Sequence, residues 1–365
     1  MRYVRWIRAV LVIIMTLFIT GTVWAQEGKK KQIDTSSDLI KEIKYIKDVH
    51  GFKLYEIIPK PDMLRHNVLF DYNFCGDKIM IYSDKYIFLI DLDSKSIFKS
   101  IKISKNLTEY INQYNVNCDE TGRFIFLSSY VYDTQSETFL NLSGSSDMPG
   151  VYLLPVYFYG GFIISSNKEG PYKVFDKTFY FLPYRKIETL TKNYDCERIL
   201  EIQKDKDNEI SIISGSEHRI CQVNLNQMKT KVIYRSKDIN MKDLQLVDGV
   251  FYFYDLKGYD MGPFTAYLYR LSLDNNDKKL ELLKIIDRFA GYIGLDKNTI
   301  IYGTEKGNVA IIEDKKENIL YKVESKFVFP LSEEDCSYCF KRAPNSSGVI
   351  FRTKKAIVIL VKSRK

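Results

Sequence analysis

The sequence predicts an all-β chain built from a repeated four-stranded unit, and three observations support this prediction. A turn opened by Asp or Asn recurs between two apolar runs, at Asp93, Asp133, Asp176, Asn226, Asp274 and Asp314. These turn residues are separated by 40, 43, 50, 48 and 40 positions, and a period of about 45 with several strands per unit is typical of β-propeller blades. Helical periodicity is weak through most of the chain. We therefore expect a β-propeller of about seven four-stranded antiparallel blades.

Each repeated unit has the same order of strands. The hairpins around the six turns lie at 89–101, 131–142, 174–182, 223–234, 271–286 and 311–323. Two further apolar runs precede each hairpin, as VLFDYNF and KIMIYS do before the first and AGYIGLD and NTIIYGT before the sixth. Asp and Asn suit the turns because their side chains bond the backbone two residues on and tolerate left-handed geometry. The pattern thus predicts four antiparallel strands in each unit.

The two ends of the chain complete the ring in this prediction. Residues 338–342, 348–353 and 356–362 supply three strands of a last blade that lacks its fourth. The strand FKLYEII, residues 52–58, has no unit of its own, so we expect it to join the last sheet and close the ring.

A ring closed by both chain ends resembles the WD-repeat and quinoprotein-type propellers in strand order, across roughly residues 52–365. The resemblance implies a shared fold only, because no Trp-Asp dipeptide or other family motif is present. Six blades would follow if the irregular third unit is an insertion. The competing fold is a pair of β-sandwiches, which would also show short alternating strands.

The N-terminus has the parts of a secretory signal. Three arginines precede an apolar run over residues 9–25, which ends in the small-residue site VWA ahead of Gln26. We expect cleavage there and a periplasmic or extracellular protein with no stable membrane insertion; the alternative is an uncleaved anchor that tethers the chain to a membrane. Residues 26–51 would then be a linker with a short amphipathic helix over 38–47, and residues 52–365 the propeller domain.

Charge and composition exclude several classes of function. The formal net charge of +8 falls to +5 when the three signal arginines are removed, and lysines are interspersed with acidic residues, so no nucleic-acid partner is expected. Both tryptophans, Trp6 and Trp24, lie in the signal, which disfavours sialidase- and quinoprotein-type propellers because their repeated motifs contain Trp. No glycine-rich phosphate-binding motif and no zinc-type ligand spacing occurs, so neither a cofactor nor a metal is predicted.

Export would permit disulfides, and the six cysteines allow fifteen complete pairings. Cys75 and Cys118 occupy equivalent places in adjacent units, so a bridge between them is conceivable, although a chain of this size does not need one. Cys336 and Cys339 form a C-x-x-C stretch, for which a local disulfide is the leading interpretation and distant or absent pairing the alternative. A redox dithiol is disfavoured because the acidic residues 333–335 would raise the thiol pKa.

No catalytic residue can be named, because His218 lies in a turn and no G-x-S-x-G motif occurs. One loop of the fifth unit, residues 254–267, breaks the repeat, and long loops on a rigid scaffold are common binding sites. Its candidate binding residues are Tyr254, Asp255, Tyr259, Asp260, Met261 and Phe264. The aromatic and Met side chains would offer an adaptable apolar surface and the carboxylates a polar rim. The other interpretation is a tolerated insertion with buried aromatics.

These observations together predict an exported, non-enzymatic propeller that binds another protein of the cell envelope or outside the cell. The alternative is an enzyme, such as a lyase or a glycan hydrolase, with carboxylates and tyrosines at the mouth of the central channel. Charged residues clustered at one end of the channel would favour the enzyme, and an apolar channel would favour the scaffold.

Overall fold

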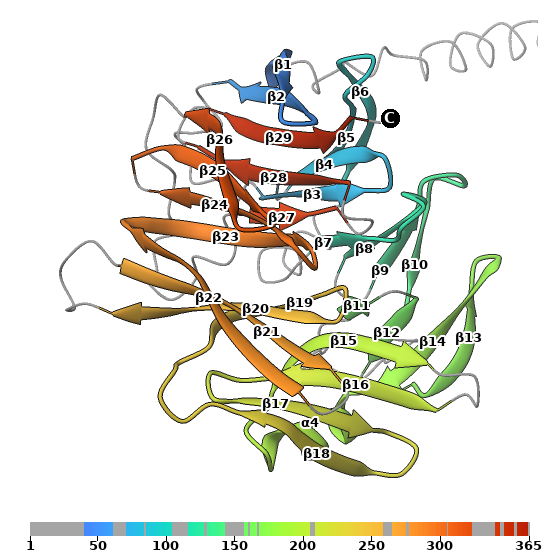
Figure 1. The fold of residues 1–365 in the computed structure, drawn as a ribbon. Coiled ribbons are helices and arrows are strands. Elements are labelled where there is room, and N and C mark those ends of the chain that lie inside the picture. Colours follow the sequence, from blue (N-terminus) through green and yellow to red (C-terminus); the bar gives the residue numbers. More distant parts are fainter. Residues whose placement is uncertain are drawn as a thin grey trace, which may run out of the picture.

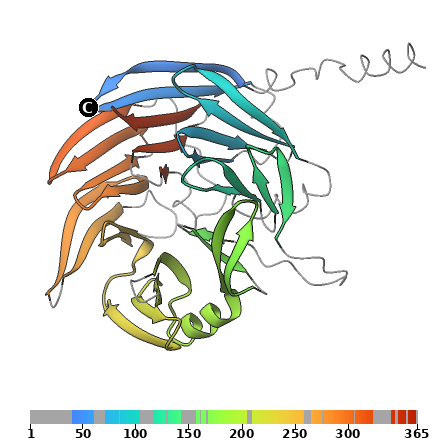
Figure 2. The same cartoon turned by 90° about the vertical axis from the view of Figure 1, so that its right-hand side faces the viewer.

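Seven β-sheets are arranged around a ring in the computed structural model of the chain (Figures 1 and 2). The structure describes residues 40–60, 71–83, 85–103, 116–127, 130–142, 157–159, 161–165, 168–204, 209–257, 265–274, 277–304, 306–322, 340–343, 347–353 and 356–363. The predicted seven-bladed β-propeller is confirmed. Across these residues no helix combines the length and the apolar character needed to cross a membrane.

The blades are numbered in chain order. Blade 1 contains β3 (Asp71–Cys75), β4 (Lys78–Tyr82), β5 (Tyr86–Asp91) and β6 (Ser96–Lys102); blade 2 contains β7 (Val116–Cys118), β8 (Phe124–Leu127), β9 (Tyr130–Asp133) and β10 (Thr138–Asn141). Blade 3 contains β11 (Tyr157–Tyr159), β12 (Phe162–Ser165), β13 (Gly170–Val174) and β14 (Lys177–Pro183), and is followed by the helix α4 (Tyr184–Lys192). Blade 4 contains β15 (Arg198–Lys204), β16 (Ile210–Gly215), β17 (Arg219–Asn224) and β18 (Lys229–Arg235). Blade 5 contains β19 (Lys242–Val247), β20 (Val250–Lys257), β21 (Thr265–Asp274) and β22 (Asp277–Asp287); blade 6 contains β23 (Phe289–Asp296), β24 (Thr299–Thr304), β25 (Asn308–Glu313) and β26 (Lys316–Lys322). Blade 7 contains β27 (Phe340–Arg342), β28 (Gly348–Arg352), β29 (Ile357–Lys362), β2 (Phe52–Pro59) and β1 (Ile40–Val49).

The core is divided among the contacts between neighbouring blades. The described residues form seven buried clusters, and each cluster joins two adjacent sheets around the ring. A middle strand therefore packs on both faces, which explains why β5 contains the continuous buried apolar run IFLI, residues 87–90. An outer strand such as β6 alternates exposed and partly buried residues instead. This division fixes the sequence pattern of each blade.

The turns between the third and fourth strands lie where the repeat predicted them, but the residue that stabilises a turn varies. In blade 2, Asp133 Oδ1 accepts a hydrogen bond from Gln135 N at 3.0 Å, as the prediction requires. In blade 1, Asp91 takes this role and accepts from Ser94 N at 2.9 Å, whereas Asp93 lies within the turn itself. The repeat therefore located the turns more reliably than their capping residues.

Both chain ends share blade 7, as predicted, because β2 pairs antiparallel with β29 along residues 52–57. The helix predicted over residues 38–47 is wrong: β1 (Ile40–Val49) is a fifth, outermost strand paired with β2. An edge strand exposed to water carries many polar residues, so its alternation was weak enough to be read as helical spacing. Within the described residues, the sheet of blade 7 thus extends back to Ile40, ahead of the predicted boundary at 52. His50 and Gly51, both with positive φ, form the two-residue turn that joins the strands.

Blade 3 departs from the common order, because β14 lies between β12 and β13 and runs parallel to β12. The composition of the two strands explains the exchange. β14 carries the buried residues Phe179, Phe181 and Leu182, which need neighbours on both sides. β13 contains Pro171, which has no N–H to donate and so suits the outer edge. The irregular third unit is therefore a blade and not an insertion.

Candidate functional site

The inner strands of the ring contact one another from blade to blade and lie closest to its centre (Figure 2). Their polar side chains are the first place to look for a site, because the enzymatic alternative requires carboxylates and tyrosines there. Two carboxylate clusters are present on these strands: a buried one between blades 4 and 5, and a partly exposed one between blades 7 and 1.

Arg198 on β15 and Asp243 on β19 link blades 4 and 5. Arg198 Nη2 donates to Asp243 Oδ1 at 3.1 Å, and Gln245 Nε2 donates to Oδ2 at 3.0 Å. The Asp243 side chain is 4% exposed, whereas that of Arg198 is 50% exposed. Burial raises the pKa of Asp243 to about 6, because a guanidinium that remains half in water offsets only part of the desolvation. Asp243 also accepts a hydrogen bond through its main-chain carbonyl from the Tyr292 hydroxyl, at 2.6 Å.

Lys341 on β27 and Asp71 on β3 link blades 7 and 1. Lys341 Nζ lies 2.7 Å from each carboxylate oxygen of Asp71, and the Tyr82 hydroxyl donates to Asp71 Oδ2 at 2.6 Å. Burial raises the pKa of Tyr82 well above its ordinary value, and the negative charge of Asp71 raises it further. Tyr82 is therefore held as a neutral hydrogen-bond donor.

In both clusters a cation from one blade holds a carboxylate from the next, so these inner-strand charges tie the ring together. Within the described ranges, no group of three or more His, Cys, Asp or Glu residues could hold a metal ion. The arrangement supplies carboxylates and tyrosines but commits each to a neighbour. The enzymatic alternative stays a prediction that these contacts do not favour.

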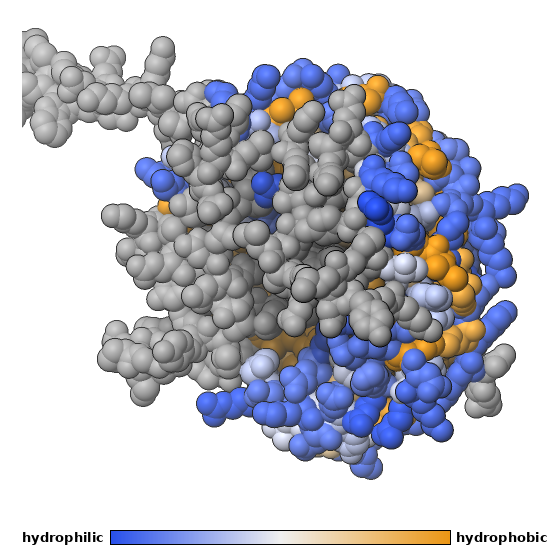
Figure 3. All heavy atoms as spheres, turned by 90° about the vertical axis from the view of Figure 1, so that its left-hand side faces the viewer, coloured by the Kyte–Doolittle hydropathy of each residue, from blue (hydrophilic) through white to orange (hydrophobic). Residues whose placement is uncertain are grey.

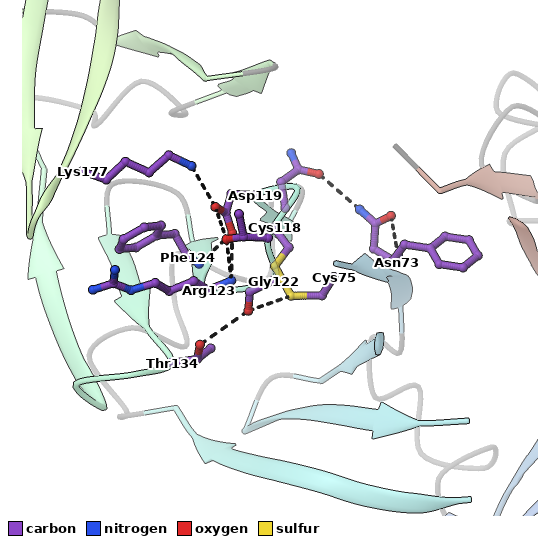
Figure 4. The surroundings of a disulfide bond; sticks show 12 residues. Asn73, Cys75, Cys118, Asp119, Gly122, Arg123, Phe124, Thr134 and Lys177 are labelled. Atoms are coloured by element: carbon purple, nitrogen blue, oxygen red, sulfur yellow. Dashed lines mark hydrogen bonds and ion pairs between the residues drawn. A yellow bond between two sulfur atoms is a disulfide. The ribbon is translucent and has the colours of Figure 1, made fainter. Parts of the chain in front are cut away.

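A disulfide joins blades 1 and 2 where their first strands end (Figure 4). Cys75 is the last residue of β3 and Cys118 the last of β7, with their Cα atoms 5.1 Å apart. The turns beside them pack so closely that a Cβ on Gly76 would meet Gly122 N at 2.9 Å, and both glycines have positive φ. This is the bridge that the equivalent positions of Cys75 and Cys118 in the two repeated units had suggested.

A second disulfide, Cys196 to Cys221, attaches the segment after α4 to β17, and no sequence pattern had indicated this pairing. Cys336 and Cys339 lie outside the described residues, so their local disulfide stays a prediction. His218 is exposed in the turn before β17, as expected.

Buried Asp119 organises the turn beside the first disulfide (Figure 4). Its Oδ1 accepts hydrogen bonds from the main-chain N–H groups of Arg123 and Phe124, each at 2.9 Å. Its Oδ2 accepts from Lys177 Nζ at 3.0 Å, which brings in the first residue of β14 from blade 3. Asp119 therefore connects blades 2 and 3 and fixes the course of the turn.

Arg123 forms the other connection between these blades. Its Nε and Nη2 donate to the two carboxylate oxygens of Asp133 at 2.9 and 3.0 Å, and its Nη1 donates to Asp176 Oδ2 at 2.8 Å. The hydrogen bonds from Arg123, with those from Gln135 N and the Ser136 hydroxyl, hold the pKa of Asp133 at about 2. Both carboxylate oxygens of Asp133 already accept hydrogen bonds, so the bidentate pair that Arg123 forms with Asp133 has a structural role.

Of the predicted loop residues, the structure describes Tyr254 and Asp255, and both lie in β20. Tyr254 is buried between blades 5 and 6, with ring centroids 4.8 Å from Phe289 and 5.9 Å from Tyr292. Asp255 is 7% exposed. Tyr259, Asp260, Met261 and Phe264 lie outside the described residues, so binding by this loop stays a prediction.

Apolar side chains are also exposed at the rim. On the outer strands they are Tyr45, Ile46, Phe98, Phe139, Leu140, Tyr172, Leu280, Leu282, Ile285 and Ile319. Lysine ammonium groups lie 5.5 to 6.0 Å from the ring centroids of three of the aromatics, Phe98, Tyr45 and Tyr172. Most of the described surface in Figure 3 is hydrophilic, with hydrophobic side chains in small groups. Among the described outer strands, β22 has the largest number of exposed large apolar residues, namely Leu280, Leu282 and Ile285.

A depression of about 610 Å³ lies beside the end of α4. Its lining includes Leu190, Thr230, Gln222 and Lys231. Thr230 donates to the main chain of α4, whereas Lys231, the next residue of β18, pairs with Gln222 and points to the opposite face of the sheet. The lining therefore wraps around an edge strand and does not form one enclosed cleft.

No protein-family model matches this chain, and a search of curated proteins also finds no match. Among solved structures, the chain is similar to one titled as the mitotic checkpoint complex, with 10% identity, 92% of this chain and 98% of that chain covered, and a TM-score of 0.44. It is also similar to a β-propeller domain from Myceliophteria thermophila, with 10% identity, coverage of 87% and 98%, and a TM-score of 0.41. A third is the extracellular domain of a hybrid two-component system from B. thetaiotaomicron, with 12% identity, coverage of 87% and 39%, and a TM-score of 0.41. Such values are too low to carry over a partner or an activity, so the fold rests on the strand pairing described above.

Proposed function

We propose that this protein is an exported β-propeller that acts as a protein-binding scaffold in the cell envelope or outside the cell. The supporting observation is a difference between the two ends of the ring. Fourth strands lead to the next blade at one end, where the chain has its longest connections, at 60–70, 103–115, 142–156, 184–197 and 323–339. Short turns such as 92–95 and 314–315 join strands at the other end. Long connections on a rigid scaffold are where binding residues concentrate.

In blade 5, the connection over residues 258–264 leaves from two strands that are paired up to its ends. β20 and β21 pair without interruption up to Lys257 and Thr265, so residues 258–264 leave from the end of a long hairpin at the same end of the ring. The burial of Tyr254 and Asp255 in this hairpin anchors it in the contact between blades. A partner held here would meet a segment whose two ends are fixed, which lowers the entropy lost on binding.

Two disulfides in the described part of the chain support an oxidising compartment, since such bonds rarely persist in reducing cytosol. The secretory signal predicted at residues 1–25 agrees with this compartment. Its cleavage can be checked by fluorescence, because both tryptophans would leave with the signal.

The binding role is tested by replacing residues 258–264 with an Asn-Gly turn, which suits the two-residue connection of a β-hairpin. We expect the unmodified protein to retain a defined partner from an envelope extract and the variant to lose it. The matched control replaces the turn at Asp314 and Lys315, at the opposite end of the ring, with the same dipeptide.

The control variant should retain the partner. Identical partners for all three proteins, or none for the unmodified protein, would contradict the assignment of binding to this end of blade 5. Circular dichroism and the unfolding midpoint would show that both variants remain folded.

A further inference from the structure

The free edge of β22 carries an inference that goes beyond the proposed function. We propose that the protein forms a two-fold symmetric dimer in which β22 of one copy pairs antiparallel with β22 of a second copy. β22 is the outermost strand of blade 5, so β21 occupies one edge and the described chain places no strand on the other. It spans Asp277–Asp287 and is paired with β21 over its length. Such an edge is a template for a further strand.

Because of a bulge in β22, the strand is complementary to a second copy of itself. The pairing with β21 skips Leu283: Leu282 faces Tyr269 and Lys284 faces Leu268. Without the bulged residue, the strand reads K-K-L-E-L-K-I-I-D from Lys278 to Asp287, with Leu282 at its centre. A two-fold axis that relates two antiparallel strands passes midway between the two copies of such a central residue. β22 therefore has a natural position for the axis at Leu282.

This register brings opposite charges and apolar residues together. Lys278 of one copy faces Asp287 of the other and Leu280 faces Ile285, while the two Leu282 residues meet on the axis. Glu281 faces Lys284 but adds no new ion pair, because Glu281 is already paired with Arg270 and Lys315, and Lys284 with Glu317, within each copy. Directly opposed residues interact most strongly across antiparallel strands. Each favourable pair occurs twice, because the two-fold axis repeats it.

The apolar residues also share one face of the sheet. Leu280, Leu282 and Ile285 oppose Leu271, Tyr269 and Tyr267, which are alternate residues of β21 and so point to the same side. Their exposed fractions are 37%, 46% and 50%. In the dimer the three side chains of each copy form one continuous stripe, which shields from water part of the largest exposed apolar group on any described outer strand.

Alternative registers are disfavoured by charge. A shift by two residues in one direction places Lys278 opposite Ile285, and a shift in the other places Asp287 opposite Leu280, so these charges lose their partners. A shift by one residue places Leu280 opposite Lys284 and breaks the apolar stripe. Lys278 and Asp287 are exposed and form no ion pair with any residue in the described ranges, so both are available to the second copy.

Sedimentation of the full chain as a function of concentration tests the dimer. We expect a reversible monomer–dimer equilibrium for the unmodified protein and a monomer for Leu282→Lys, because this change sets two ammonium groups against each other on the axis. Ile319→Lys is the matched control: Ile319 is 62% exposed on the neighbouring outer strand β26, and its substitution should leave the dimer unchanged. A monomer at every concentration, or a dimer that Leu282→Lys does not weaken, would overturn the proposal.

The register has a separate test. Lys278→Asp should weaken the dimer at least tenfold by opposing two carboxylates, and Lys278→Asp combined with Asp287→Lys should restore it. Under mild oxidation Leu282→Cys should give a disulfide-linked dimer, whereas Ile319→Cys should not. Failure of both the restoration and the cross-link would exclude this register. The partner captured by residues 258–264 should bind Leu282→Lys normally, so the dimer and the scaffold function can fail independently.

Discussion

Blades 2 and 5 differ in the interactions that hold each sheet in the ring. The strands of blade 2 are short: β7 has three residues and β8, β9 and β10 have four each. Those of blade 5 are long, with eight residues in β20, ten in β21 and eleven in β22. A short strand offers few backbone hydrogen bonds and little apolar surface, so a short blade needs other attachments.

Blade 2 has such attachments on both sides. The disulfide between Cys75 and Cys118 connects it to blade 1, and Arg123 and Lys177 connect it to blade 3.

Blade 5 has longer strands and packs over more apolar surface, with Tyr252 and Phe253 fully buried on its two sides. It is also bonded to blade 4 through Arg198 and Asp243 and to blade 6 through Lys284 and Glu317. Its outer strand extends far enough to leave apolar residues exposed. The difference indicates that short blade 2 depends on specific bonds to both neighbours, whereas long blade 5 combines such bonds with extensive packing and an exposed apolar outer strand.

Removal of the disulfide in blade 2 should have the largest effect. For a sequence separation of 43 residues, the entropy of loop closure predicts that Cys75→Ala with Cys118→Ala lowers the free energy of unfolding by about 4 kcal/mol. Urea denaturation measures this loss, and hydrogen exchange should show that blades 1 and 2 lose protection before blade 5.

The control for this change is Cys196→Ala with Cys221→Ala, whose separation is 25 residues and whose cost should be slightly smaller. Its loss of hydrogen-exchange protection should be confined to blade 4 and α4. Equal loss of protection in all blades for both variants would mean that the blades open together and that the contrast drawn above is wrong.

The two arginine–aspartate pairs should give the next largest effect on stability. Arg123→Met should cost about 3 kcal/mol at neutral pH, because Asp133 is 1% exposed and would keep a buried charge without its partner. Arg198→Met should cost about 1 kcal/mol or less, since Asp243 already has a pKa near 6 and can take up a proton instead. Thermal and urea unfolding of the two variants measure the difference. Equal costs would contradict the assignment of opposite roles to these carboxylates.

The strand order, the turns and the ring closure could all be predicted because they depend on local patterns. An apolar run such as IFLI and an Asp-containing turn are visible within a dozen residues. β1 was missed because polar edge strands have weak alternation, although His50-Gly51 was an available turn signal. Pro171 could likewise have indicated that β13 lies at an edge.

The contacts between blades could not be predicted, because they join residues whose positions within separate sheets are unknown beforehand. Arg198 and Asp243 are 45 positions apart, and nothing near either residue identifies the other. The pairing of Cys196 with Cys221 depends on α4, which interrupts the repeat. The self-complementary pattern of β22 could not be predicted either, because it depends on the position of the bulge at Leu283.

The pH dependence of stability gives the smallest effect and separates the two buried carboxylates by sign. The pKa of Asp133 is about 2, below the usual 3.8, so its contribution to stability is present above pH 4 and is lost as the pH falls toward 2. The pKa of Asp243 is about 6, so its contribution is present below pH 4 and is lost as the pH rises through 6. Each shift corresponds to roughly 2–3 kcal/mol.

Two substitutions measure these contributions. Relative to the unmodified protein, Asp243→Asn should gain stability between pH 4 and pH 7, because it removes a carboxylate that is costly to ionise in its buried position. Asp133→Asn should lose stability between pH 2 and pH 4 and show a constant deficit above that range. Urea midpoints recorded across both ranges give the two profiles. If both profiles slope in the same direction, the half-exposed Arg198 must hold Asp243 as firmly as Arg123 holds Asp133, and blades 4 and 5 would then be joined by charge as strongly as blades 2 and 3.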